Sequence, residues 1–151
     1  MEQLIEQYKQ GYSKICKEIE GLTEEQLLFK PSERSWSIKE IIIHVADSEL
    51  VLIHRMKAVF SEDNPILTAF DQDLWTTRLN SQHIDHQLYL QLFKSLRESF
   101  LPILYHLTEQ DYVRIGTHNQ EGQLTFEEIF EHAIEHIDTH IEQIRRVKKL
   151  F

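Results

Sequence analysis

The stretch Glu131-His132-Ala133-Ile134-Glu135-His136-Ile137-Asp138-Thr139-His140-Ile141 places three histidines at regular steps of four residues. On a helix, residues four positions apart lie above one another, so the three imidazoles form a row along one side. Two neutral imidazoles at this spacing bind a transition-metal ion when a further ligand comes from elsewhere in the chain. The stretch therefore predicts a helix with a metal-binding edge.

The composition indicates one globular domain without a basic surface. The chain has 151 residues, of which 41% are hydrophobic, so we expect residues 1–151 to fold as a single domain around an ordinary core. Only four glycines and three prolines are present, and apolar residues repeat at three- and four-residue steps, which favours an all-α fold. The formal charge of −9 argues against nucleic acid or an anionic membrane as a partner.

The sequence leads us to expect a cytoplasmic protein. Its first residues lack a basic segment followed by an apolar run, and no apolar stretch approaches the length of a membrane span. The single cysteine, Cys16, excludes an internal disulfide and fits a reducing compartment.

Four long helices are predicted from apolar stripes and capping signals. Ser37 and Thr125 are each followed three residues later by a glutamate, which is the capping-box signature of a helix start. Pro102 is expected to bend the third helix or to break its last turn. The expected helices cover about residues 3–21, 37–60, 89–107 and 125–148.

The connection between the second and third helices is long, covering about residues 61–85. It begins at a breaker, Glu62-Asp63-Asn64-Pro65, and residues 71–75 indicate a short helical piece within it. Such a connection can carry the chain from one end of a bundle to the other, so that the second and third helices run parallel. We therefore expect an up-down-down-up four-helix bundle, with a polar loop before the last helix.

The second helix is apolar on more than one side. Ile38 and Ile41 belong to its main stripe, whereas Ile43 and Leu50 make the opposite side apolar as well. Either the domain wraps this helix on several sides, or a second subunit covers it. Of these two explanations we favour the second, and we expect a homodimer.

Within the last helix, the row of histidines winds towards the core. At about 100° per residue from Phe126, His140 falls about 40° and His136 about 80° from the centre of the apolar side. His132 falls at about 120° and is expected at the rim. His136 and His140 are therefore the inward-facing pair.

A third ligand is expected from the second helix. His44 lies at the edge of its apolar side, about 10 Å along the axis from the helix start. If the second and fourth helices are antiparallel and about 36 Å long, His140 lies near the same level. Three imidazoles at one level predict a transition-metal site formed by His44, His136 and His140. The alternative is that His136 and His140 are hydrogen-bonded histidines of the bundle and that His44 is unrelated to them.

Two sharper histidine motifs fit less well. His136 and His140 have the spacing of the outer histidines of a zincin helix, but Ile137 stands where the general-base glutamate belongs. The string from His132 to His136 fits the inverted motif, yet its Glu135 would point away from the core. The remaining histidines have no companions at metal-ligand spacing.

Several of these segments together resemble one family. Trp36-Ser37-Ile38-Lys39-Glu40-Ile41, leading into His44-Val45-Ala46-Asp47-Ser48-Glu49, resembles the signature of the DinB/YfiT-like metalloproteins. The ending His136-x-x-x-His140-Ile141-x-Gln143-Ile144 and the segment from Asn64-Pro65 to Trp75 are similar to later parts of that family. The resemblance implies an up-down-down-up bundle, frequently dimeric, in which His44, His136 and His140 hold zinc or nickel.

The resemblance also implies an activity. The family includes transferases that use low-molecular-weight thiols such as bacillithiol or mycothiol, and members described as metal-dependent hydrolases. A metal ion with open positions lowers the pKa of a bound thiol or water. We therefore expect a metal-dependent transferase that joins a thiol cosubstrate to a small electrophilic substrate. A small-molecule hydrolase and a non-catalytic, dimeric metal-binding module are the alternatives.

Four further residues are candidates for the site. Glu49, within the apolar arc of the second helix, is a candidate catalytic base or partner of a ligand, against the alternative of an exposed or intersubunit charge. Asp47 follows His44 by about one turn and is a candidate for orienting a ligand. Asp71 and Trp75 are expected to line the pocket mouth, although Trp75 suits a packing anchor equally well. Neutral imidazoles accept several metals, so the sequence does not fix the ion.

Overall fold

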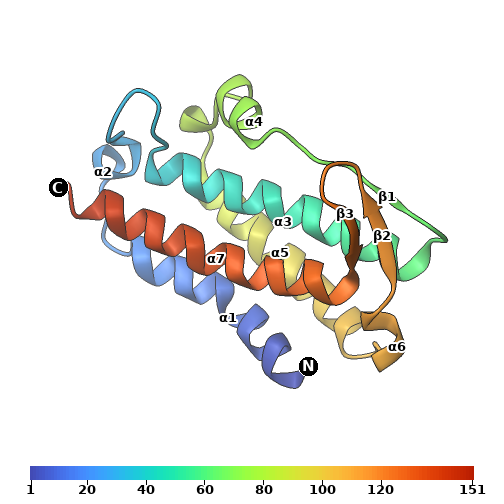
Figure 1. The fold of residues 1–151 in the computed structure, drawn as a ribbon. Helices are drawn as coiled ribbons and strands as arrows, with labels where there is room; N and C mark the ends of the chain where they lie inside the picture. Colours follow the sequence, from blue (N-terminus) through green and yellow to red (C-terminus); the bar gives the residue numbers. More distant parts are fainter.

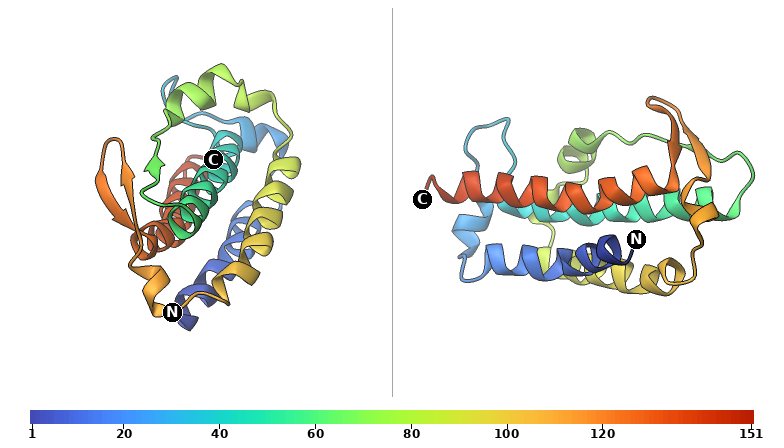
Figure 2. Two further views of the ribbon diagram at one scale, coloured as in Figure 1. Left: turned by 90° about the vertical axis from the view of Figure 1, so that its right-hand side faces the viewer. Right: turned by 60° about the horizontal axis from the view of Figure 1, so that its bottom comes forward.

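Four long helices lie side by side in the computed structural model, which describes residues 1–151 (Figure 1). The chain direction shows that α3 and α5 run one way and that α1 and α7 run the other way, which is the predicted up-down-down-up arrangement (Figures 1 and 2). The bounds of the long helices are α1 Glu2–Ile19, α3 Ile38–Ser61, α5 His86–Leu104 and α7 Phe126–Lys148. Short helices stand between them, namely α2 Glu24–Leu28, α4 Gln72–Arg78, the 3₁₀ turn η1 Ser81–His83 and α6 Glu109–Tyr112.

Both predicted capping boxes are present at the helices that carry the histidines. The Glu40 amide donates to the Ser37 hydroxyl at 3.2 Å, and the Ser37 amide donates back to the Glu40 carboxylate at 2.8 Å. Thr125 and Glu128 make the same exchange, at 3.1 and 2.7 Å. Each box satisfies amides that the first turn of a helix leaves without a partner. Because each helix start is fixed in this way, so is the height of each histidine along the bundle.

The third long helix differs from the expectation at both ends. It begins at His86, where the Asp85 side chain accepts a hydrogen bond from the Gln87 amide at 2.9 Å. It continues through Pro102 for two residues and ends at Leu104. Proline removes one backbone donor and crowds the preceding turn, which fits a helix end so close behind it. The predicted extension to residue 107 is wrong, because the chain has already turned towards α6.

A small sheet departs from the all-α expectation. Its strands are β1 (Ile66–Leu67), β2 (Ile115–His118) and β3 (Gly122–Thr125). β2 pairs in antiparallel fashion with β3 and in parallel with β1, where Ile66 lies opposite Thr117. The segment expected to be a polar loop is therefore a hairpin. Gly116 permits its close approach, because a Cβ there would lie 2.8 Å from the Val59 side chain.

The long crossover is anchored at two places. At its start, β1 joins the hairpin that precedes α7. Further along, the predicted helical piece is present as α4, with the Asp71 side chain accepting from the Leu74 amide at 2.9 Å. Figure 1 shows the crossover passing over α3 on the way from one end of the bundle to the other. This path leaves α3 and α5 parallel.

The apolar second side of α3 is covered within the chain as far as Glu49, whereas the next residue, Leu50, is 45% exposed. Every residue from Ile38 to Glu49 is buried, because α3 packs against α5 and α7 and is also contacted by α2, α4 and η1 (Figure 2). Wrapping by its own domain therefore accounts for the apolar residues of α3 up to Val45, but not for Leu50. The homodimer stays a prediction.

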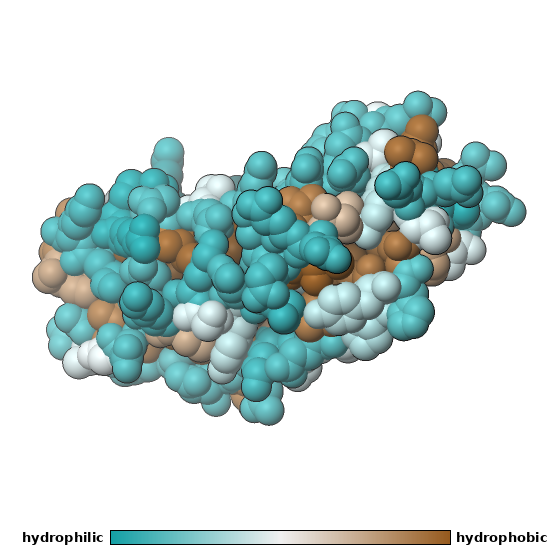
Figure 3. Space-filling view, turned by 90° about the horizontal axis from the view of Figure 1, so that it is seen from below, coloured by the Kyte–Doolittle hydropathy of each residue, from teal (hydrophilic) through white to brown (hydrophobic).

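The outer surface is mostly polar. Seen from below, the molecule shows hydrophilic side chains over most of one face, with hydrophobic ones in the seams between them (Figure 3). Amphipathic helices such as α1 and α7 produce this pattern by turning one apolar stripe inward. None of the helices has the combination of length and hydropathy that a membrane crossing requires.

Candidate metal centre

Three imidazoles meet between α3 and α7. The Nε2 atom of His136 lies 3.2 Å from Nε2 of His44 and 3.0 Å from Nε2 of His140. One ring nitrogen from each of the three residues lies within 4.8 Å of the other two. α7 contributes two rings one turn apart, and the antiparallel α3 brings the third to the same height, as the helix-length argument predicted.

The two nitrogen–nitrogen separations at His136 fit coordination of one metal ion. Imidazole nitrogens bind zinc at about 2.0–2.1 Å, so two ligands at tetrahedral or octahedral angles lie about 2.9–3.4 Å apart. The observed separations of 3.0 and 3.2 Å fall in this range. His44 is buried, whereas His136 and His140 are half-buried, so the cluster is reached from the bundle edge.

Burial keeps these imidazoles neutral. Loss of solvent, followed by repulsion from His140, lowers the pKa of His44 to about 3. The same causes, with smaller contributions from other neighbours, lower the pKa of His136 to about 2. Desolvation also lowers the pKa of His140. A metal ligand must offer a free lone pair, and at neutral pH all three rings have one.

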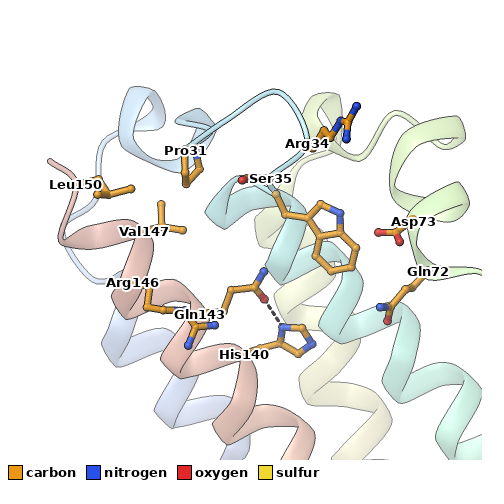
Figure 4. Close-up of a pocket in the computed structure, with 11 residues that line it drawn as sticks. Pro31, Arg34, Ser35, Gln72, Asp73, His140, Gln143, Arg146, Val147 and Leu150 are labelled. Carbon is orange, nitrogen blue, oxygen red and sulfur yellow. Dashed lines mark hydrogen bonds between the residues drawn. The ribbon is translucent and has the colours of Figure 1, made fainter.

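Gln143 fixes the tautomer of His140. The Nδ1–H of His140 donates to the Gln143 side-chain oxygen at 2.7 Å, which leaves the Nε2 lone pair facing the other two rings (Figure 4). Such partners orient a metal-binding imidazole and raise its basicity. The sequence contained a signal, because Gln143 follows His140 by three residues on the same helix face, but no role was predicted for it.

Two aromatic rings enclose the cluster and were also missed. The Trp36 ring lies 4.7 Å from the His44 ring and stacks on His140 at 6.4 Å between centroids. The Phe70 ring stacks on the His44 ring at 6.4 Å between centroids. Trp36 precedes the cap of α3, so only the fold of the preceding loop could place its ring. Phe70 belongs to the crossover, whose path has no periodic sequence signal.

Glu49 belongs to a buried network rather than to the imidazole cluster. Its Oε1 accepts from the Tyr8 hydroxyl, and its Oε2 accepts from Arg97 Nη2 at 2.9 Å. Arg97 also donates to the backbone oxygens of Tyr8, at 2.6 Å, and Ala133, at 2.7 Å. Because both carboxylate oxygens are engaged, this placement favours a structural role for Glu49 over the predicted catalytic one. The guanidinium ties α5 to all three other long helices.

Asp47 lies beside the cluster in sequence but makes no hydrogen bond to it. Its side chain is buried, and desolvation raises the pKa of Asp47 to about 6. The pKa of Tyr89 on α5 is raised by burial and, to a smaller extent, by the negative charge of Asp47. This position gives no support to the predicted role in orienting His44.

Asp71 and Trp75 lie at a largely apolar cavity of about 550 Å³ on the outer side of α3, together with Leu50, Val51, His54 and Phe70. Trp75 packs edge-on against Phe70 at 4.9 Å, and Phe70 in turn faces His44. Of the predicted pocket residues, Trp75 therefore reaches the cluster through one intervening ring.

A second cavity, also of about 550 Å³, opens beside His140 (Figure 4). His140 and Trp36 form part of its wall, so this cavity adjoins the imidazoles directly. Figure 4 shows Gln143 and Arg146 from α7 on one side and Gln72 and Asp73 from α4 on the other.

The remaining histidine of the row lies outside the cluster. His132 is exposed, as predicted for the rim, with its ring centroid 5.7 Å from that of His136. Glu135 is exposed too and points away from the imidazoles. Neither the zincin spacing nor the inverted motif therefore places a glutamate at the cluster.

An up-down-down-up helical bundle with three histidines meeting between two of its helices defines a recognisable class. The chain belongs to this class, the DinB superfamily, whose family model matches residues 7–144. The resemblance noted from the sequence is thereby confirmed.

The chain is similar to YfiT of Bacillus subtilis in fold and sequence. The solved structure of YfiT, described as having an unusual four-helix bundle topology, superposes with a TM-score of 0.91 at 23% identity, covering 98% of this chain and 85% of that one. In sequence, "Putative metal-dependent hydrolase YfiT" is 24% identical over 91% of this chain and 78% of YfiT. Similarly named proteins of Oceanobacillus iheyensis and Halalkalibacterium halodurans are 23% and 33% identical, and the alignments span 69% and 51% of their lengths.

Proposed function

We propose that the protein is a metal-dependent transferase that joins a low-molecular-weight thiol to a small electrophile. The proposal rests first on the three imidazoles, whose neutral state and spacing suit one divalent transition-metal ion, zinc or nickel. A bound ion of this kind would supply the positive charge that lowers the pKa of a thiol at the site.

The observation that favours a transferase over a hydrolase is the presence of two cavities of different character, one adjoining the cluster at His140 and one separated from His44 by the Phe70 ring. The cavity at His140 is lined largely by polar side chains, whereas the cavity at Phe70 and Trp75 is largely apolar. A transferase must bind two different substrates, whereas a hydrolase needs one substrate and water. Two dissimilar cavities therefore support a reaction with two organic substrates.

The residues of the chain have separable tasks in this reaction. His44, His136 and His140 would hold the ion through their ring nitrogens, and Gln143 keeps the His140 lone pair directed at it. Trp36 shields the rings from solvent. The thiol loses its proton to solvent or buffer, its sulfur forms a bond to an electrophilic carbon, and the leaving group departs with the electron pair of the broken bond.

Metal content tests the centre first. The wild-type protein and a His136→Ala, His140→Ala double variant are purified without added metal and analysed for zinc, nickel, copper and iron. His132→Ala is the matched control, because His132 belongs to the same row but lies outside the cluster. We expect close to one ion per chain in the wild type and control and almost none in the double variant. Negligible metal in all three would overturn the proposal.

Turnover then separates the two reactions. A chromogenic aryl halide is incubated with the metal-loaded protein, with and without a panel of small thiols. A transferase releases halide only when a thiol is present. Release without thiol would instead support a hydrolase, the activity for which the similar proteins are named. Metal binding without turnover of either kind would favour the non-catalytic module.

A further inference from the structure

The cavity beside His140 carries an excess of positive charge. Arg34 and Arg146 both line it, whereas Asp73 is the only acidic residue in its wall. This local sign is opposite to that of the chain as a whole, whose formal charge is −9. A cationic recess in an acidic protein concentrates small anions at that point.

The two arginines have no hydrogen-bonding partner within the chain. Arg55, Arg97, Arg114 and Arg145 each donate to a carboxylate or a backbone oxygen, whereas Arg78 lacks such a partner and lies outside this cavity. Arg34 and Arg146 make no hydrogen bond or ion pair with any other residue, and both are among the residues that line the cavity. Figure 4 shows them on different sides of the recess, with Arg34 on the loop before α3 and Arg146 on α7.

The rest of the lining suits a small polar molecule. Gln72 and Gln143 provide amide groups on facing sides, and His140 lies at the inner end (Figure 4). Guanidinium groups bind carboxylates through two parallel hydrogen bonds, which gives them direction as well as charge. A cavity of about 550 Å³ has room for a molecule of metabolite size.

We infer that this cavity binds a small carboxylate-bearing molecule through Arg34 and Arg146, with one end of the ligand directed at the imidazole cluster. The inference deepens the proposed function by naming the chemistry of one substrate, but binding itself does not depend on turnover. Arg146 also lies in the last turn of α7, where any cation is favourable. A measurement of ligand binding distinguishes a role of Arg146 in holding a carboxylate from a role in stabilising the end of α7.

Calorimetric titration tests the inference with succinate and with its uncharged counterpart succinamide, at low ionic strength. Two variants are compared with the wild type. The first is a double variant that carries both Arg34→Gln and Arg146→Gln, and the second is the single variant Lys57→Gln. Lys57 is an exposed cation that lines none of the cavities described above, so its loss controls for overall charge. Chelator-treated wild-type protein is titrated as well, because a carboxylate can also bind a metal ion. Circular dichroism confirms that each variant is folded.

We expect the wild type to bind succinate at least about tenfold more tightly than succinamide, and the arginine double variant to lose most of that preference. Lys57→Gln and the chelator-treated protein should keep it. Equal binding of the two compounds, or no binding of either, would overturn the inference. So would loss of succinate binding in the chelator-treated protein alone, which would assign the carboxylate to the metal. If the protein held no metal but still bound succinate through the arginines, only the proposed function would fail.

Discussion

Replacing Gly11 with alanine sets helix propensity against tertiary packing. Gly11 lies on the buried side of α1, against the guanidinium of Arg97. A Cβ at this position would overlap Nη1 of Arg97 and lie 3.0 Å from its Cζ. Arg97 would have to withdraw from hydrogen bonds that reach α1, α3 and α7.

The two effects differ enough in size for the sign to be predicted. Alanine in place of glycine inside a helix stabilises by about 1 kcal/mol. Displacing Arg97 would leave Glu49 buried without its partner, which costs about 3–5 kcal/mol. We therefore expect Gly11→Ala to lower the free energy of unfolding by about 2–4 kcal/mol.

Urea unfolding followed by circular dichroism measures this change in two backgrounds. In an Arg97→Lys background, the side chain keeps its charge but lacks the group that Cβ would overlap. There, Gly11→Ala should be neutral or stabilise by up to about 1 kcal/mol. If Gly11→Ala stabilised the wild type, or cost the same in both backgrounds, the packing argument would be refuted.

Three further changes test the site and its support. In chelator-treated protein, the lowered pKa values of His44 and His136 mean that the unfolded state binds more protons below about pH 6.5. Lowering the pH from 6.5 to 5.0 should therefore lower the free energy of unfolding by about 3 kcal/mol through the two histidines, and the raised pKa of Asp47 offsets about 1 kcal/mol of this loss. Urea unfolding at the two pH values should show a net loss of stability, and a gain would contradict the reasoning. Gln143→Leu should weaken zinc binding about 10- to 100-fold in competition with a chromophoric chelator, because the His140 tautomer is no longer fixed. Ser37→Ala removes the cap of α3 and should cost about 1 kcal/mol in thermal unfolding, and an unchanged midpoint would show that the cap contributes nothing.

Much of the arrangement of the histidines follows from local sequence rules. The four-residue spacing in α7 aligns two imidazoles on one face, and the capping boxes at Ser37 and Thr125 set the start of each helix. Since the rise per residue of a helix is constant, the heights of His44 and His140 follow from counting. These features depend on neighbours within a few residues, which is why the sequence alone was enough to place three rings at one level.

The roles of polar residues between the helices depended on tertiary contacts. Glu49 lies within the same apolar arc whether it acts as a base or as a buried ion-pair partner, and only Arg97, 48 residues further along the chain, decides between these roles. The hairpin before α7 was missed because its strands are four residues long, too short for alternation to be distinguished from a loop.

Local chemistry therefore determined where the imidazoles stand along each helix, because periodicity and capping act over short distances in the chain. Tertiary structure alone decided what surrounds them. Gln143, Trp36 and the unpaired Arg34 and Arg146 gain their significance from separate elements packing side by side. No periodic pattern in the sequence indicates which side chain will be the partner of another across such an interface. The role of these residues is therefore defined only when the helices and the crossover pack together.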